Sequence, residues 1–461
     1  MEPAFWREQV GGVLHGQRVL LFGGPLAAWT SRVEELTALG VSEIAVLATE
    51  GEGAGPLPTA ESQRTIVFDC RQPTVLDTIR ATSALLANLP AEAGRFVDDV
   101  DPTLVIGSFL NEQPRLAGRA VLAHRRPEWL ALEDKVIIDA FWDRAGVERV
   151  PSVIVDASDA TRLDATRRAL DRGDGTVLAG DAREGFNGGG EYTRLVVTED
   201  DRDEAMAFLE AHCDRVRVMP CLDGIPCSIH GIVFADHVVA LRPIEMVVHR
   251  RPSAPRFRYG GCATWWDPRP DDRHEMRAIA RRVGTQLRNE VDFRGAFTVD
   301  GIMTVDGFRP TELNPRMGAG LNTMLRGINE LPLQLVLDAL VGGVELDYRP
   351  NELETAILAA GDANRAGGTW SAVPDHVDTI EGGRLALDPD GTVRWVAPDE
   401  QGVATLTAGG SPRRSFIRCL FDAEALPLGA SVGPVTAAFW AFADRELGTS
   451  VGALEPARSV R

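Results

Sequence analysis

Short apolar runs alternate with amphipathic stretches over the first part of the chain. The runs "RVLLFGG", "EIAVLATEG" and "TLVIGSFLN" are separated by segments with helical periodicity, of which "AAWTSRVEELTALG" is the clearest. Apolar strands that alternate with helices indicate a small doubly wound parallel sheet. Ligands bind at the carboxyl ends of such strands, so residues 107–113 are either the border of a substrate crevice or an ordinary loop. The turn "FGGPLA" lacks the third glycine of a dinucleotide-binding turn, which disfavours such a site.

The pattern changes at Pro127. A helical pattern runs through "PEWLALEDKVIIDAFWDRAGV", and a strand and a second helix follow it. Two strand-like runs are then joined by a loop with three consecutive glycines, which let a backbone approach a ligand or close as a lid but also occur in plain turns. A further sheet, an arginine-rich stretch and a long helix come next. Beyond Pro350, several strands and the last helix, "PVTAAFWAFADRELG", indicate a separate unit.

An acidic hairpin is the most informative feature of the sequence. Residues 293–320, "FRGAFTVDGIMTVDGFRPTELNPRMGAG", form two strand patterns joined by a turn that contains Gly307. A two-residue loop would place Asp300 and Glu312 on opposite faces, whereas a three-residue loop with Gly307 in the left-handed conformation places them directly opposite each other. We predict the three-residue loop because Asn314 then shares their face, about 6.5 Å along the strand. The carboxylates would repel each other unless a hard cation such as magnesium lay between them.

Composition limits the class of protein. The chain has 461 residues, 44% hydrophobic and 25% charged, which predicts a soluble globular protein of several packed units. Neither a membrane span nor an export signal is evident, so we expect a cytoplasmic protein. The formal charge of −19 disfavours nucleic acid as a partner. The six cysteines form neither a CxxC pair nor a zinc spacing, so they predict reduced thiols.

Lys135 is the only lysine of the chain, although 48 positions are lysine or arginine. It follows an aspartate and precedes a valine, so there is no phosphate-binding P-loop, and nothing around it indicates a pyridoxal site. The sequence "GASVG" matches the nucleophile elbow of α/β hydrolases, but no histidine follows its serine, as that fold requires. A compact ammonium can approach a phosphate oxygen where a planar guanidinium fits poorly. Lys135 is therefore either a phosphate ligand or a chance survivor of codon bias.

The order of these elements, with "DK", a glycine lid, a hinge strand, an acidic strand and then "ELNPR", resembles the ATP-grasp superfamily of carboxylate-amine ligases. The resemblance covers about the first three quarters of the chain. Within that superfamily, "GGPLAAW" and the appended C-terminal unit look most like peptide ligases of the pheganomycin type. The resemblance implies an α/β ATP-grasp fold of four parts: a Rossmann-like domain (1–126), a small subdomain with the lid (127–218), a large subdomain with the metal site (219–348) and a small α+β C-terminal domain (349–461).

The resemblance also implies a reaction and its cofactors, ATP and Mg²⁺. A carboxylate would be activated as an acyl phosphate and joined to an amine, either an amino acid or a peptide, with release of ADP and phosphate. Asp300, Glu312 and Asn314 would bind the metal, Arg316 would neutralise the acyl phosphate, and Lys135 would bind the other phosphates. The remaining contacts to ATP would come from the lid and the hinge: Arg183, Asn187, Gly188, Gly189, Gly190, Cys221, Leu222 and Asp223. The backbone of residues 221 and 222 would read adenine, residue 223 the ribose, and the loop 186–191 would close over the phosphates.

The chain departs from the superfamily pattern at two positions. Ala179 stands where a second phosphate-binding lysine is usual, and Met219 stands where the hinge usually begins with an acidic or amide residue. Arg183 either replaces the missing cation or is a solvated loop residue.

Substrate recognition is less well defined by the sequence. Residues 242–258 contain five arginines and one acid, which suggests carboxylate capture by Arg250, Arg256 or Arg258, near Gly318, or else a solvated face. His230 lies in an alternating strand and fits a satisfied core residue better than a ribose contact.

Two alternatives remain open: a catalytically silent ATP-binding module, and an ATP-grasp enzyme with a thiol or water acceptor. The expected partners are small-molecule or peptide carboxylates and amines, without nucleic acid or membrane. The oligomeric state is open, and a homodimer is compatible with the sequence.

Overall fold

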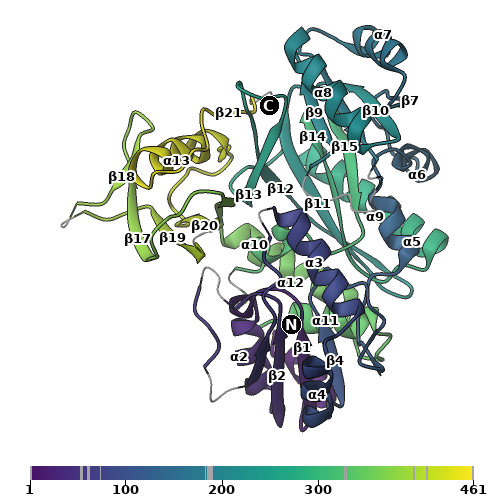
Figure 1. Cartoon of the computed structure of the whole chain (residues 1–461), viewed down its shortest axis with the longest axis vertical. Helices are drawn as coiled ribbons and strands as arrows, with labels where there is room; N and C mark the ends of the chain where they lie inside the picture. The colour runs from purple at the N-terminus through teal and green to yellow at the C-terminus, as the bar shows by residue number, and fades with distance from the viewer. Residues whose placement is uncertain are drawn as a thin grey trace.

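The computed structural model describes residues 3–51, 55–59, 63–72, 74–181, 183, 190–326, 328, 330–397, 400–411 and 414–458. Its strands form four sheets. The N-terminal sheet lies at one end of the long axis, a small sheet with α7 and α8 lies at the other end, and the C-terminal strands project from the middle (Figure 1). None of the helices described is both long and apolar enough to cross a bilayer.

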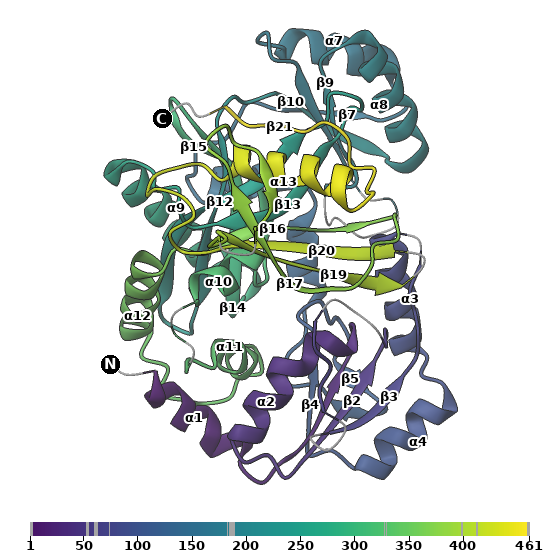
Figure 2. The ribbon, with the colours of Figure 1, turned by 90° about the vertical axis from the view of Figure 1, so that its left-hand side faces the viewer.

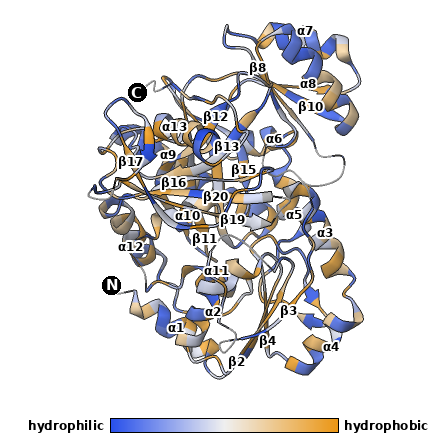
Figure 3. Cartoon of the chain, turned by 60° about the vertical axis from the view of Figure 1, so that its left-hand side comes forward, coloured by the Kyte–Doolittle hydropathy of each residue, from blue (hydrophilic) through white to orange (hydrophobic). Residues whose placement is uncertain are grey.

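The N-terminal part is a parallel sheet, as predicted, and its four strands run in the order β3-β2-β1-β4. Its central residues Leu20, Ala45 and Val105 are aligned across three strands and buried. Figure 3 shows hydrophobic residues along β2 and β4, whereas α7 at the far end of the molecule carries hydrophilic and hydrophobic residues together. The elements are β1 (Arg18–Phe22), β2 (Glu43–Ala48), β3 (Arg64–Val67), β4 (Leu104–Gly107), α1 (Ala4–Leu14), η1 (Leu26–Trp29), α2 (Thr30–Ala38), α3 (Val75–Ala87) and α4 (Ala91–Val100), followed by a short pair, β5 (Arg115–Leu116) and β6 (Arg119–Ala120).

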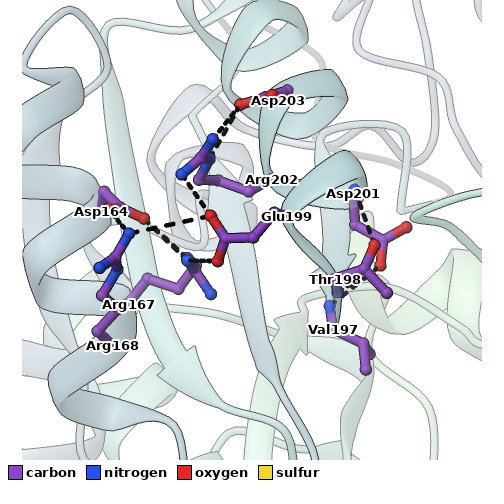
Figure 4. Close-up of polar contacts among 9 residues, drawn as sticks. All are labelled: Asp164, Arg167, Arg168, Val197, Thr198, Glu199, Asp201, Arg202 and Asp203. Atoms are coloured by element: carbon purple, nitrogen blue, oxygen red, sulfur yellow. Dashed lines mark hydrogen bonds and ion pairs between the residues drawn. The ribbon is translucent and has the colours of Figure 1, made fainter.

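A small antiparallel sheet follows, in the order β7-β10-β8-β9. Its elements are β7 (Val153–Asp156), β8 (Thr176–Gly180), β9 (Thr193–Val196), β10 (Arg215–Pro220), α7 (Ala160–Leu170) and α8 (Glu199–His212). Thr198 and Asp201 form a capping box that starts α8. Arg167 of α7 lies 2.9 Å from Glu199 of α8 and ties the two helices together (Figure 4). Both helices pack on one face of the sheet, which leaves its other face for the candidate site.

The large sheet runs in the order β15-β14-β11-β12-β13-β16-β20-β19-β17-β18, and β21 pairs with β12. The C-terminal strands continue it, because Cys262 of β13 pairs with Gly368 of β16 (Figure 2). The long helix α9 packs on β11 and β12, and α13 covers the C-terminal strands. The strands are β11 (Ile225–Val233), β12 (Val238–Arg250), β13 (Phe257–Ala263), β14 (Gly295–Thr304), β15 (Gly307–Asn314), β16 (Gly367–Val373), β17 (Ile380–Leu387), β18 (Val393–Trp395), β19 (Ala404–Ser411), β20 (Arg414–Phe421) and β21 (Glu455–Pro456). The helices are α9 (Pro270–Val291), α10 (Ala319–Met324), α11 (Leu333–Val341), α12 (Pro350–Ala363) and α13 (Gly433–Glu446).

The continuous helix predicted from Pro127 is wrong. The segment forms α5 (Pro127–Leu130), the short η2 (Ala131–Glu133) and α6 (Ile138–Arg144). Asp134 has extended backbone angles, φ −70° and ψ 114°, and its carboxylate accepts a 2.8 Å hydrogen bond from the Val136 N–H. An aspartate that captures a neighbouring backbone donor in this way competes with helix formation. The break leaves Lys135 in a turn.

Candidate functional site

Asp300 and Glu312 lie directly opposite each other on β14 and β15, as the sequence predicts. The predicted three-residue turn is wrong, because Thr304 pairs with Gly307 across a two-residue loop. Gly307 has a φ of 103°, a conformation that favours glycine. A two-residue turn alone would not pair Asp300 with Glu312, so this pairing must have another cause.

A β-bulge at Thr311 produces the pairing. Gly301 pairs with Pro310, whereas the next residue, Asp300, pairs with Glu312. Thr311 is the extra residue, and the side chains of Asp300 and Glu312 come to the same face because of it. Without the bulge, Thr311 would stand opposite Asp300.

Asp300 is held by two neighbours on that face. The Ser228 hydroxyl donates to its Oδ1 at 2.5 Å, and the Asn314 side-chain amide donates to its Oδ2 at 2.9 Å. Burial, and secondly the charge of Glu312, raise the pKa of Asp300 above its ordinary range. A cation bound between the two carboxylates would favour the charged form of Asp300.

Lys135 reaches this acidic pair from the turn before α6. Its Nζ lies 3.0 Å from Glu312 Oε2, and the two side chains are only 12% and 19% exposed. The only lysine of the chain therefore lies beside the pair of carboxylates predicted from the sequence.

Arg316 is oriented by a chain of buried groups. Its Nε lies 3.1 Å from Glu133 Oε1, and its Nη2 donates to Asn314 Oδ1 at 2.8 Å. Glu133, 4% exposed, also pairs with Arg125. The backbone N–H of Arg125 donates to the Asn111 carbonyl at 2.9 Å. This chain links the acidic hairpin to residues 107–113 of the N-terminal domain.

Gly318 lies against the floor of the same face. A Cβ at this position would stand 2.6 Å from Thr298 Oγ1 and 2.9 Å from His230 Cε1, so only glycine fits without movement. His230 Nδ1 lies 2.8 Å from the Thr298 hydroxyl, and burial lowers the pKa of His230 to about 3. His230 is thus a neutral core residue, as the sequence analysis favours, and not a ribose contact.

The hinge residues lie at the end of β10. The Cys221 N–H donates to the Gly175 carbonyl at 2.9 Å, so this predicted adenine donor is already used. Leu222 and Asp223 follow, both half-buried. Arg250 Nη2 lies 3.4 Å from Cys221 Sγ, which places Arg250 at the hinge.

The two departures from the superfamily pattern form one apolar patch. Ala179 and Met219 pack together with Val150, and Val177 and Leu222 lie against them. Ala179, Met219 and Val150 are buried, whereas Val177 and Leu222 are partly exposed.

The predicted glycine lid falls mostly outside the described residues. Asn187, Gly188 and Gly189 lie outside the described residues, and Gly190 has a φ of 69°. The Arg183 guanidinium donates to the Cys213 carbonyl at 2.8 Å and pairs with Asp214 at 2.9 Å. Arg183 therefore caps the end of α8.

The structure does not group the three predicted substrate arginines. The Arg256 guanidinium lies over the Phe208 ring of α8 at 5.6 Å, and that of Arg258 lies over the Trp440 ring of α13 at 4.7 Å. Of the three, Arg250 is the one that contacts the hinge.

Sequence reasoning missed Ser228 and Glu133. Both reach the site from segments far from the hairpin, and neither belongs to a motif. The register of β11 against β14 places Ser228 opposite Asp300, and the break in the predicted helix lets Glu133 reach Arg316.

The donor set fits magnesium. Among the described residues, no group of three His, Cys, Asp or Glu side chains is placed to hold a metal ion. The predicted set is of a different kind, because it contains two carboxylates and one amide. Mg²⁺ commonly binds one or two carboxylates and completes its shell with water and substrate phosphates. Two adjacent, partly buried carboxylates match this chemistry.

Neither a protein-family model nor a curated protein sequence matches the chain. Solved structures do. The biotin carboxylase domain dimer of 2-oxoglutarate carboxylase from Hydrogenobacter thermophilus, in complex with MgADP, ADP and bicarbonate, is 13% identical over 95% of this chain and 91% of its own, with a TM-score of 0.55. Biotin carboxylase from Campylobacter jejuni is 11% identical over 88% and 87%, with a TM-score of 0.55. N5-carboxyaminoimidazole synthase from Aspergillus clavatus, in complex with ADP and 5-aminoimidazole ribonucleotide, is 11% identical over 93% and 99%, with a TM-score of 0.51. At these identities the likeness shows the fold: the chain has the α/β ATP-grasp fold.

Proposed function

We propose that this chain is an ATP-dependent ligase that activates a carboxylate as an acyl phosphate and joins it to an amine, with release of ADP and phosphate. One observation carries the proposal: Asp300 and Glu312 are paired on one face of the hairpin, with Asn314 beside them and Lys135 and Arg316 at their edges. The ATP-grasp fold supports it, since two of the similar structures were determined with ADP.

Asp300, Glu312 and Asn314 would hold Mg²⁺. When bound, the metal would neutralise phosphate charge as the γ-phosphoryl group is transferred. Ser228 fixes one oxygen of Asp300, which orients the carboxylate before any ligand arrives.

The reaction has two balanced steps. A carboxylate oxygen attacks the γ-phosphorus, and the bond to ADP breaks. The amine nitrogen then attacks the acyl carbon, the bond from that carbon to the phosphate oxygen breaks, and the nitrogen gives its proton to solvent. Lys135 and Arg316 would stabilise the negative charge of the phosphates in both steps.

The apolar patch beside the hinge would bind adenine, with the ribose near Asp223. The loop 186–191 would exclude water, which otherwise hydrolyses an acyl phosphate. Of the three arginines predicted to bind substrate, Arg250 contacts the hinge and would therefore lie beside the nucleotide.

We infer that at least one substrate is an amino acid or a small peptide, as in ligases of the pheganomycin type. Support comes from the resemblance of "GGPLAAW" and of the C-terminal unit, whose strands continue the large sheet. We also propose a homodimer, since the similar biotin carboxylase domain of 2-oxoglutarate carboxylase is a dimer.

Hydroxylamine trapping tests the proposal. The purified chain is incubated with MgATP, hydroxylamine and a panel of amino acids and dipeptides, and both ADP and hydroxamate are measured. For at least one carboxylate of the panel, we expect equal amounts of ADP and hydroxamate, because hydroxylamine takes the place of the amine substrate. Tight ATP binding without ADP release in the presence of any of these amino acids or dipeptides would favour a catalytically silent ATP-binding module. Thioester formation with an added thiol would favour a thiol acceptor.

A further inference from the structure

The bulge that pairs Asp300 with Glu312 is held from outside the hairpin. The Thr311 hydroxyl donates to the Asp300 carbonyl at 3.2 Å, which ties the extra residue to its own hairpin. The Thr311 carbonyl accepts a hydrogen bond from Arg217 Nη1 at 3.2 Å. Since a bulged residue lacks its normal ladder partner, this second bond satisfies a carbonyl that the hairpin leaves open.

Arg217 lies on β10 with a side chain that is 0% exposed. Its Nε and Nη2 grip the two oxygens of Asp139 at 3.1 and 2.5 Å, and its Nη1 reaches Thr311. All three nitrogens of the planar Arg217 guanidinium therefore donate hydrogen bonds, two of them to Asp139 and one to Thr311. A lysine could not make the same three bonds, because its donors radiate from one nitrogen.

The position of Arg217 explains why it is not itself a phosphate ligand. It pairs with Ala179 across β10 and β8, so it stands beside the site of the usual second lysine. All three of its donor groups are engaged with Asp139 and Thr311, and none of its side chain is exposed.

One short segment of the chain therefore holds two consecutive residues of β15. Lys135 contacts Glu312 directly at 3.0 Å. Asp139, four residues later, orients the arginine that holds Thr311. The bulge and the carboxylate that follows it are fixed together.

We propose that Arg217 is a positioning residue for the metal site: by holding the Thr311 bulge it keeps Glu312 on the face of Asp300. The proposal rests on the proposed function, because it assumes that the two carboxylates bind Mg²⁺. If the bulge were lost, Glu312 would turn to the opposite face and Thr311 would stand opposite Asp300.

The test compares Arg217→Met with Arg149→Met. Arg149 is a matched control, because it lies 3.6 Å from Asp139 and pairs with Asp143 at 2.9 Å but forms no described contact with β15. With saturating ADP, the free Mg²⁺ concentration that gives half of the magnesium-dependent rise in unfolding temperature is measured. We expect Arg217→Met to raise this concentration at least about tenfold. Arg149→Met should change it less than about twofold, even if both variants lose stability.

Arg217→Lys covers the case in which Arg217→Met does not fold. It keeps the charge but loses the fork, so the magnesium requirement should still rise at least about threefold. Unchanged magnesium dependence in every folded Arg217 variant would overturn this proposal alone. The absence of any magnesium effect in the wild-type chain would overturn the proposed function, and this proposal with it.

Discussion

Removing the single ammonium at the site, with Lys135→Ala, should lower ADP formation sharply. The Lys135 side chain is 12% exposed and lies 3.0 Å from Glu312, so its charge acts in a mostly desolvated place. A hydrogen bond from a charged donor contributes about 1.5–3 kcal/mol, which corresponds to about a 10- to 150-fold loss of kcat/KM for ATP. Lys135→Arg should also be impaired, because the guanidinium is larger than the ammonium.

Stability must be separated from turnover in this experiment. Lys135→Ala leaves Glu312 without this partner beside Asp300, which should destabilise the chain by about 1–2 kcal/mol. Arg309→Ala is the control: Arg309 also lies on β15 and pairs with Glu148 at 3.1 Å, outside the site. It should keep kcat/KM within about threefold of the wild type.

Chemical modification provides an independent assay. An amine-directed acetylating reagent can react only with Lys135 and the α-amino group, since the chain has no other lysine. Acetylation of Lys135, located by mass spectrometry, should remove ATP turnover, and saturating MgATP should slow it. Rapid modification in the presence of MgATP, or a Lys135→Ala protein of normal activity, would refute the reasoning and leave Lys135 as a survivor of codon bias.

Three further predictions follow from the contacts. Asp300→Asn should lower ADP formation at least about tenfold while the protein stays folded, because one metal-binding oxygen is lost; circular dichroism and a rate assay check both parts. Gly318→Ala should raise the KM for substrate and cost about 1–3 kcal/mol in a denaturant titration, since its Cβ would stand 2.6 Å from Thr298 Oγ1. Burial raises the pKa of Glu245, which accepts hydrogen bonds from Ser431 and the start of α13, to about 7. The native state then holds a proton that the unfolded state releases, so stability should fall by about 3 kcal/mol as pH rises from about 4.5 to about 7, and stay level above that. Glu245→Gln should flatten this part of the profile, and an unchanged profile would contradict the assignment.

The acidic pair could be predicted because it depends on local alternation. Asp300 and Glu312 are twelve residues apart around one turn, so few registers exist, and only one puts Asn314 on their face. The β-bulge at Thr311, which selects this register, could not be predicted. It is stabilised by Arg217, which is far away in the sequence. The parallel sheet was predictable for a similar reason, since its apolar runs are short and well separated.

Other features depend on long-range contacts or on competition that periodicity does not show. The helical pattern around Lys135 is strong, yet the Asp134 carboxylate captures a backbone N–H and breaks the helix. Arg183 and Arg256 are charged residues near the expected site, but they lie on the carbonyls at the end of α8 and on an aromatic ring. The direction of a long side chain is set by its tertiary neighbours, which a linear pattern does not identify.

If Asp300 and Glu312 hold the metal of a bound nucleotide, as we propose, removing one of the two carboxylates should weaken metal binding. Titration of Mn²⁺ in the presence of saturating ADP, followed by the electron paramagnetic resonance signal of free Mn²⁺, counts the ions that the protein binds once the Mn²⁺ bound by ADP alone, measured in a protein-free titration, is subtracted. The wild-type chain should bind Mn²⁺ in the presence of ADP. Glu312→Gln, folded to the same extent, should lose that binding by at least about tenfold in affinity. Equal Mn²⁺ binding by the two proteins would contradict the account.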